Sequence, residues 1–216
     1  MIDMQNARCY YSITTFTNVN DFTAAYTFRG EMSMYQGKNN TAIQSQQWLG
    51  ESLVRLMSQT SYPSITVGAI CKEADLSRQT FYNVFENKEE ILRFCLRQQY
   101  EKQFQRFADQ DVITVGEIVG AFAVVVAENQ NLLRRMIENQ LDSVLADEIT
   151  RCVALFAGKF VKKEQPGERL AYSEVLLSGA LGHLLVYWFR QEQPISMEEL
   201  TQLITEFLEG QMFTLA

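Results

Sequence analysis

The chain contains 216 residues, of which 47% are hydrophobic and 21% charged, and its formal net charge is -7. These values are typical of a globular protein, and the length allows one large domain or two small ones. Four widely separated cysteines without a CxxC pair and a single histidine predict neither a disulfide framework nor a zinc site, so we expect a reducing, cytoplasmic compartment. No apolar run reaches the roughly 20 residues of a membrane span, and the N-terminus lacks a secretory pattern, so no membrane partner is expected.

The negative charge is unevenly distributed along the chain. Residues 1–40 carry three basic and three acidic residues, residues 41–106 carry eight and seven, and residues 107–216 carry eight and sixteen. The acidity therefore belongs to the C-terminal half, while the middle block is close to neutral. This split predicts two modules with different partners.

The first segment, residues 1–40, is rich in Thr, Asn, Tyr and Phe and shows no helical period. We expect a disordered arm or a non-native extension translated from upstream sequence, with Met32 or Met34 as the true start. An arm that tracks along DNA is the alternative, which the sparse basic residues of this segment disfavour.

Strand signals are nearly absent beyond residue 40, and apolar residues recur there with a helical period. Polar residues suited to capping stand before several of the predicted helices, and Pro, Gly and Asn interrupt them. Thr66 and Ser77 precede two short helices, whereas Asn87 with Glu90 and Ser196 with Glu199 have the spacing of a capping box. The predicted helices cover residues 41–60, 66–75, 77–85, 87–107, 113–129, 131–161, 168–190 and 196–209.

The two short helices joined by a tight turn have the geometry of a helix-turn-helix, whose second helix enters the major groove of DNA. On a helix that advances about 100° per residue, Phe81, Val84 and Phe85 share one arc and are expected to pack on neighbouring helices. The opposite arc of residues 77–85 is polar and carries no carboxylate, so nothing on it repels a phosphate backbone.

The polar arc carries residue types that recognise nucleic acid. Arg78 can bond guanine in a bidentate manner, and Gln79 and Asn83 can do the same to adenine. Hydroxyl groups can donate to phosphates, and a lysine beside the free N–H groups of a helix start is a phosphate clamp. The predicted DNA-contacting residues are Thr66, Ser77, Arg78, Gln79, Thr80, Tyr82, Asn83 and Lys88.

The block Ile65–Leu92, ITVGAICKEADLSRQTFYNVFENKEEIL, resembles the DNA-binding signature of TetR-type transcriptional regulators. Many relatives have Gly where Asp75 stands in the turn, and an Asp can also adopt the left-handed conformation there. The matching positions are Thr66-Val67, Ala74, Thr80-Phe81-Tyr82, Phe85, Asn87-Lys88-Glu89 and Leu92.

The resemblance implies an all-α fold with a three-helix DNA-binding domain followed by a helical domain for ligand sensing and dimerisation. We place the first domain at residues 41–88 and the second at residues 89–216, linked by a helix over 88–107. By the same resemblance, Thr80, Tyr82 and Lys88 contact phosphates, and Arg78, Gln79 and Asn83 are base readers. Packing of Tyr82 against the first helix is an alternative role.

The last two predicted helices, 168–190 and 196–209, are the expected homodimer contact. Apolar residues surround most of the first of them, which predicts burial on more than one side. Gly179, Ala180 and Gly182 would let a partner helix approach closely. The end of this region, SGALGHLLVYWFRQEQPISMEEL, is also similar to a subgroup of TetR-type sensor domains.

A pocket for a small-molecule effector has less support in the sequence, because aromatic side chains at helical spacing are more often core than ligand contacts. For His183 we favour a core or interface role with a satisfied hydrogen bond over a ligand contact. A metal or catalytic role is least supported, since no second ligand stands at helical spacing. The residues proposed for the pocket are Phe104, Phe122, Phe156, Tyr172 and His183.

The sequence therefore predicts a homodimeric repressor that a small molecule releases from a palindromic operator of double-stranded DNA. The alternative is a regulator whose C-terminal domain binds a protein partner. An enzyme is disfavoured, because the chain has no GxSxG, P-loop, glycine-rich dinucleotide turn or metal cluster, and no cofactor is expected.

Overall fold

The computed structural model describes residues 39–107, 109–110, 113–160 and 167–211, without the side chains of 156–160 and 167–170. The expectations for residues 1–38 lie outside this part. Regular structure in the described residues is helical, without strands, and no helix among them is both long and apolar enough to cross a membrane. The helices are α2 (Asn40–Met57), the 3-10 helix η1 (Tyr62–Ser64), α3 (Val67–Glu73), α4 (Arg78–Tyr82), α5 (Lys88–Gln105), α6 (Val115–Glu128), α7 (Gln130–Glu138), α8 (Asp142–Phe160), α9 (Gly167–Arg190) and α10 (Met197–Leu208).

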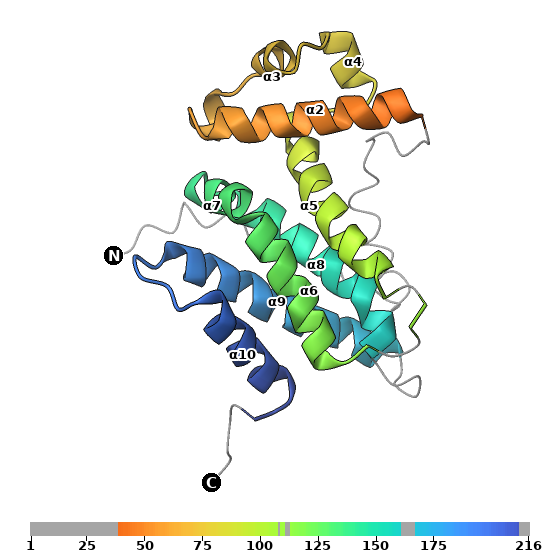
Figure 1. The fold of residues 1–216 in the computed structure, drawn as a ribbon, viewed down its shortest axis with the longest axis vertical. Coiled ribbons are helices and arrows are strands. Elements are labelled where there is room, and N and C mark those ends of the chain that lie inside the picture. Colours follow the sequence, from red (N-terminus) through yellow and green to blue (C-terminus); the bar gives the residue numbers. More distant parts are fainter. Residues whose placement is uncertain (1–38, 108, 111–112, 161–166, 212–216) are drawn as a thin grey trace, which may run out of the picture. The chain divides into compact units, whose positions relative to one another are not determined.

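Helices α2, α3 and α4 pack on one another and form the predicted helix-turn-helix (Figure 1). The two predicted N-caps are confirmed: the Thr66 side chain accepts from Ala69 N–H, and the Ser77 side chain accepts from Thr80 N–H. Helix α4 is shorter than the predicted span 77–85, because the chain leaves the helix at Asn83. The N–H groups of residues 84 and 85 still bond to Phe81 O, so the apolar arc stays buried.

The turn between α3 and α4 depends on Asp75, which has the left-handed conformation expected of it, with φ 53. Asp75 N–H donates to Lys72 O, and Leu76 N–H donates to Cys71 O at 2.9 Å. These two bonds form a Schellman motif, which satisfies the last carbonyls of a helix and reverses the chain. Asp75 therefore adopts the left-handed conformation for which glycine is more common at the end of a helix.

The helical stretch predicted over 131–161 is interrupted once, because the chain forms two helices there, α7 and α8. The break is a second Schellman motif, in which Gln140 has φ 59 and Leu141 N–H donates to Met136 O at 2.9 Å. No glycine or proline marks this corner, so composition provided no signal for it. The two helices can therefore pack in different directions, and α7 contacts both α8 and α9.

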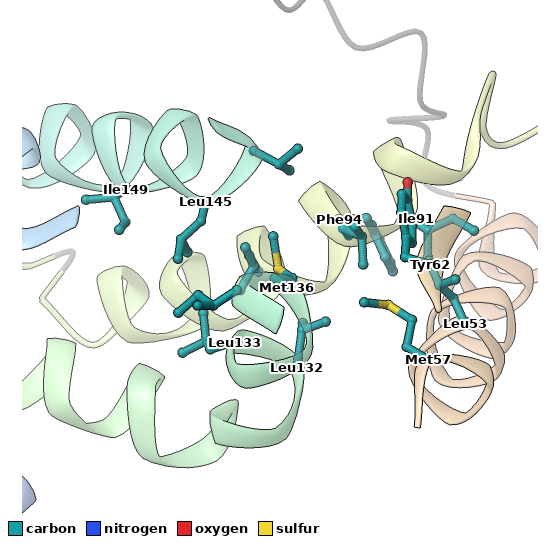
Figure 2. Close-up of a cluster of buried hydrophobic side chains, with 14 of the residues drawn as sticks. Leu53, Met57, Tyr62, Ile91, Phe94, Leu132, Leu133, Met136, Leu145 and Ile149 are labelled. Carbon is teal, nitrogen blue, oxygen red and sulfur yellow. The ribbon is translucent and has the colours of Figure 1, made fainter. Parts of the chain in front are cut away.

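Helix α5 carries the chain from the helix-turn-helix into the C-terminal helices, where it packs on α6 and α8. Helix α8 in turn packs along α9, and α10 lies against α6 (Figure 1). Buried side chains form a continuous apolar cluster from α2 to α10, part of which is shown in Figure 2, with Met57 and Tyr62 on one side and Leu132 and Met136 on the other. The helices of the helix-turn-helix and the C-terminal helices therefore share one core.

The capping box predicted at Ser196 is confirmed, with reciprocal bonds between Ser196 and Glu199. At the start of α5, the Asn87 side chain accepts from the N–H groups of Glu89 and Glu90. Glu90 bonds back to the N–H of Glu86 at 2.8 Å instead of that of Asn87. The cap itself is as expected, and the reciprocal partner lies one residue earlier.

Candidate functional site

The outer face of α4 presents the polar side chains that the sequence predicts for DNA contact. Phe81 is fully buried and anchors the helix, while Gln79 and Asn83 are exposed. Tyr82 is 60% exposed and its ring packs edge-on against Phe81, with centroids 5.1 Å apart. Tyr82 therefore packs against the anchor of its own helix and still exposes much of its side chain, which leaves it accessible for a DNA contact.

The hydroxyl groups at the start of α4 are engaged within the helix. Ser77 Oγ accepts from Thr80 N–H at 2.9 Å and lies 2.8 Å from Thr80 Oγ1. One hydroxyl proton of this pair stays available to donate outward, since a pair of hydroxyls needs only one donor between them. Ser77 thus has a definite capping role, and its hydroxyl contact holds the Thr80 side chain in place. The phosphate contact of Thr80 stays a prediction.

Arg78 begins α4 and is exposed, but its side chain lies against the preceding helix. A Cβ atom placed on Gly68 of α3 would lie 2.5 Å from Arg78 Nη2. The same proximity affects Cys71: burial raises the pKa of this thiol, and the charge of Arg78 offsets part of the rise. Among the described residues, no hydrogen-bond or ion-pair partner is found for the Arg78 guanidinium.

The structure gives Lys88 another role than the predicted phosphate clamp. Its Nζ donates to the carbonyl oxygens of Tyr62 at 2.6 Å and Ile65 at 2.8 Å, and it lies 4.2 Å from the centroid of the Tyr62 ring. Burial lowers the pKa of Lys88. The ammonium group therefore closes the η1 segment onto the start of α5, and its donors point into the protein.

A second polar contact ties η1 to the C-terminal helices. The Tyr62 N–H donates to Asn139 Oδ1 at 2.7 Å, and Asn139 Nδ2 donates to Arg135 O at 2.8 Å. Asn139 caps α7 at the corner before α8. Sequence reasoning missed this contact, because the two partners are 77 positions apart and neither belongs to a motif.

An apolar cavity of about 90 Å³ lies among the C-terminal helices. Helices α5 to α10 all contribute to its wall, and Phe122 is the one member of the predicted pocket set with a described side chain that is found there. The residues around it are Leu96, Tyr100, Gln103, Ile118, Val119, Ala121, Phe122, Val125, Val126, Leu133, Leu145, Glu148, Ile149, Cys152, Val153, Leu177, Leu181, Leu185, Ile204 and Leu208.

Of the other residues proposed for the pocket, Phe104, Tyr172 and His183 do not line the cavity. Phe104 packs in a small separate cluster with Phe107 and Ile113, and the Phe156 side chain is outside the described residues. Tyr172 is 67% exposed. His183 is also exposed, with Nδ1 2.9 Å from Gly179 O, so the expected hydrogen bond is present. The side chain does not lie in the core of the described residues, and the interface role stays a prediction.

A buried carboxylate lies beside the cavity. The Glu148 side chain is 2% exposed, and it accepts from Tyr100 Oη at 3.0 Å and from Arg93 Nη1 at 3.3 Å. Arg97 and Arg151 lie 3.8 and 3.6 Å away. Arg93 also bonds Glu89 and Asp147, and these bonds hold the pKa of its guanidinium high although burial opposes them. The sequence carried a weak signal, since Glu148 shares a helix face with Leu145 and Cys152.

Apolar side chains of α9 form an exposed stripe. Leu176 is 75% exposed and Tyr187 66% exposed, and Tyr172, Gly179 and His183 lie on the same side of the helix at spacings of three and four residues. Among the described residues of α9, the buried side chains thus lie on one side of the helix. Gly182 does not belong to the stripe, because it faces Ile149 of α8.

Among the described residues, no three histidine, cysteine, aspartate or glutamate side chains come together as metal ligands would. The thiols of Cys95 and Cys152 are neutral at physiological pH, because burial raises the pKa of each to about 12. Within the described part of the chain, these groups therefore add no chemical site to the outer face of α4 and the cavity.

Comparison with known proteins gives the same family as the residue pattern. Residues 51–94 match the family model described as bacterial regulatory proteins, tetR family. The HTH-type dhaKLM operon transcriptional activator DhaS of Lactococcus lactis subsp. lactis (strain IL1403) is 32% identical over 69 residues, which are 32% of this chain and 37% of that protein. The alignment thus spans little more than a third of the curated relative.

Solved structures extend the similarity to the fold of both domains. The dihydroxyacetone kinase operon activator DhaS has a TM-score of 0.55 and 19% identity, over 78% of this chain and 96% of that one. Lin0861 from Listeria innocua has a TM-score of 0.56 and 16% identity, over 82% and 96%. Residues 51–94 are thus similar to the DNA-binding segment of the tetR family of bacterial regulatory proteins, and the described helices share the fold of these solved structures.

Proposed function

We propose that the protein is a homodimeric repressor that binds a palindromic DNA operator in the cytoplasm and leaves it when a small apolar molecule occupies the cavity. The observation that carries the proposal is the face of α4: a buried Phe81 fixes the helix, and its outer side offers Arg78, Gln79 and Asn83 without any carboxylate. Such side chains recognise base edges in the major groove.

The exposed stripe of α9 supports the homodimer. An apolar helical face centred on Leu176 would be costly in water, and a second copy of the same helix can cover it in a symmetric contact. A Cβ atom placed on Gly179 would have no neighbouring atom within 4 Å, so a partner helix can approach closely at that point. Dimerisation also places two recognition helices on two half-sites, which multiplies sequence specificity.

The chemistry of the cavity supports an uncharged apolar effector. Aliphatic and aromatic side chains form most of the cavity wall. The carboxylate of Glu148 is already paired with the arginine side chains beside it. The carboxylate would repel an anionic ligand. A strongly polar ligand would lose its hydrogen bonds to water without gaining new ones from the apolar wall. At about 90 Å³ the space is smaller than an engineered cavity of about 150 Å³ that binds benzene, so only a small molecule fits without expansion.

A protein partner in place of the small molecule is the second candidate. The small volume of the cavity favours it, and so does the curated relative, which is named as an activator and not as a repressor. A thermal-shift screen against small apolar compounds separates the candidates. A compound that raises Tm and also weakens operator binding supports the effector, whereas a single stoichiometric protein retained on the C-terminal domain supports the partner.

Selection of bound sequences from random DNA tests the proposed DNA binding. The purified protein should enrich an inverted repeat whose half-sites are about one helical turn, or a multiple of it, apart. Its affinity for that sequence should fall steeply as salt concentration rises, because phosphate contacts release counterions. A reporter behind the enriched sequence then gives the sign of regulation. Enrichment of no sequence would contradict the proposal.

A further inference from the structure

We propose that Gly68 is a specificity-determining residue of the DNA-binding domain. Its missing side chain provides the space that the Arg78 guanidinium occupies beside α3, and that position decides which base edge the arginine reaches. The inference rests on the proposed DNA-binding function and assigns to α3 a part in recognition that the residue pattern of α4 alone does not include.

The contact between the two residues leaves no room for a Cβ atom at position 68 while Arg78 keeps its observed position. A Cβ atom there would lie 2.5 Å from Nη2 of Arg78 and 3.3 Å from both Cζ and Nε. Three atoms of the guanidinium, Nη2, Cζ and Nε, therefore lie close to the glycine. Because these atoms are the tip of a flexible side chain, a larger residue would displace the arginine without disturbing the backbone.

Other forces do not explain why the guanidinium lies there. Arg78 has no hydrogen-bond or ion-pair partner among the described residues, and the first turn of α3 carries the positive end of the helix dipole, which repels a cation. We therefore attribute the position of the Arg78 side chain to the space that Gly68 leaves open. All five N–H donors of the guanidinium are left for an acceptor outside the protein.

The chain contains a matched control for a substitution at this position. Gly68 follows Thr66 and Val67 at the start of α3, and Gly116 follows Thr114 and Val115 at the start of α6. Both threonines cap their helices, but no atom lies within 4 Å of a Cβ placed on Gly116. Gly116→Ala therefore reproduces the backbone effect of Gly68→Ala without the steric one.

The experiment compares the sequences that the full-length variants enrich from random DNA. Gly68→Ala should keep its Tm and its affinity for unselected DNA, and should change the preferred base at one position of each half-site by about tenfold, as expected when one arginine contact is moved. Gly116→Ala should leave the preference unchanged. In an Arg78→Ala background, Gly68→Ala should have no further effect.

Three results would overturn the inference: an unchanged preference in Gly68→Ala, an equal loss of affinity on all sequences, or an effect of Gly68→Ala that persists without Arg78. Failure of the proposed DNA-binding function would give a different experimental result. In that case the unmodified protein itself enriches no sequence, whereas failure of this inference leaves the enriched operator in place.

Discussion

The ammonium group of Lys88 donates a hydrogen bond to the carbonyl oxygen of Tyr62 at 2.6 Å, while the N–H of the same Tyr62 donates to Asn139 Oδ1 at 2.7 Å. One residue of the η1 segment is thus held from two directions, by the start of α5 and by the corner between α7 and α8. Because α7 and α8 also line the cavity, a ligand that moved these helices would act on a residue that lies between α2 and α3.

Removal of the Lys88 ammonium should destabilise the protein. In Lys88→Met the aliphatic stem remains, but the carbonyl oxygens of Tyr62 and Ile65 lose their buried donor, which costs about 1–3 kcal/mol of unfolding free energy. Urea denaturation measures the change, and Lys72→Met, at an exposed position of α3, is the control. If Lys88→Met unfolds like the unmodified protein yet binds all DNA sequences weakly, the phosphate contact first predicted for this residue is correct.

Loss of the Asn139 side chain should weaken communication between the two domains. Asn139→Ala removes the acceptor of Tyr62 N–H and should cost about 1 kcal/mol of stability. It should also reduce the change in operator affinity that a cavity ligand produces. Asn129→Ala is a close control, because Asn129 caps α6 through the same bond to a carbonyl four residues earlier but does not contact η1. Equal ligand responses in the two variants would exclude Asn139 as the link.

Neutralising Glu148 should be among the most damaging single changes. Glu148→Gln leaves three arginines around a site without its carboxylate, and the loss of one member of a buried ion cluster costs about 3–5 kcal/mol. Glu138→Gln breaks only the surface pair with Arg135 and should cost less than about 1 kcal/mol. Thermal unfolding of both variants checks this, and similar Tm values would show that the cluster contributes little.

A charge on the exposed face of α9 should prevent dimer formation. Leu176→Glu places a carboxylate where two apolar helices are proposed to meet, so sedimentation velocity should give a monomer with reduced operator affinity. Trp48→Glu, which changes another exposed apolar residue on α2, should remain dimeric. A dimer in both variants would move the subunit contact to another surface.

Partial filling of the cavity should separate stability from effector binding. Val126→Ile adds one methylene group to the wall and should raise stability by up to about 0.8 kcal/mol while it weakens binding of small apolar probes such as xenon. Val175→Ile, on the exposed face of α9, should change neither quantity. Thermal unfolding with and without the probe gives both values. Unchanged probe binding in Val126→Ile would show that the probe occupies another site.

Much of the DNA-binding domain follows from the sequence alone, because the signals there are local. The caps at Thr66 and Ser77, the left-handed turn at Asp75 and the buried arc of Phe81, Val84 and Phe85 all depend on residues within about one helical turn of one another. The amino-acid types at these positions therefore contain the information that fixes them.

Only the tertiary structure decided the features that depend on distant partners. Lys88 was assigned to a phosphate because its own neighbourhood is a helix start, yet its hydrogen-bond partners lie 26 and 23 positions earlier. Glu148 of α8 forms its ion-pair cluster with arginine side chains of α5. The corner at Gln140 has no glycine or proline from which it could be predicted. Hydrogen bonds and ion pairs join groups that are close in space, and spacing along the chain predicts such closeness only within a helix.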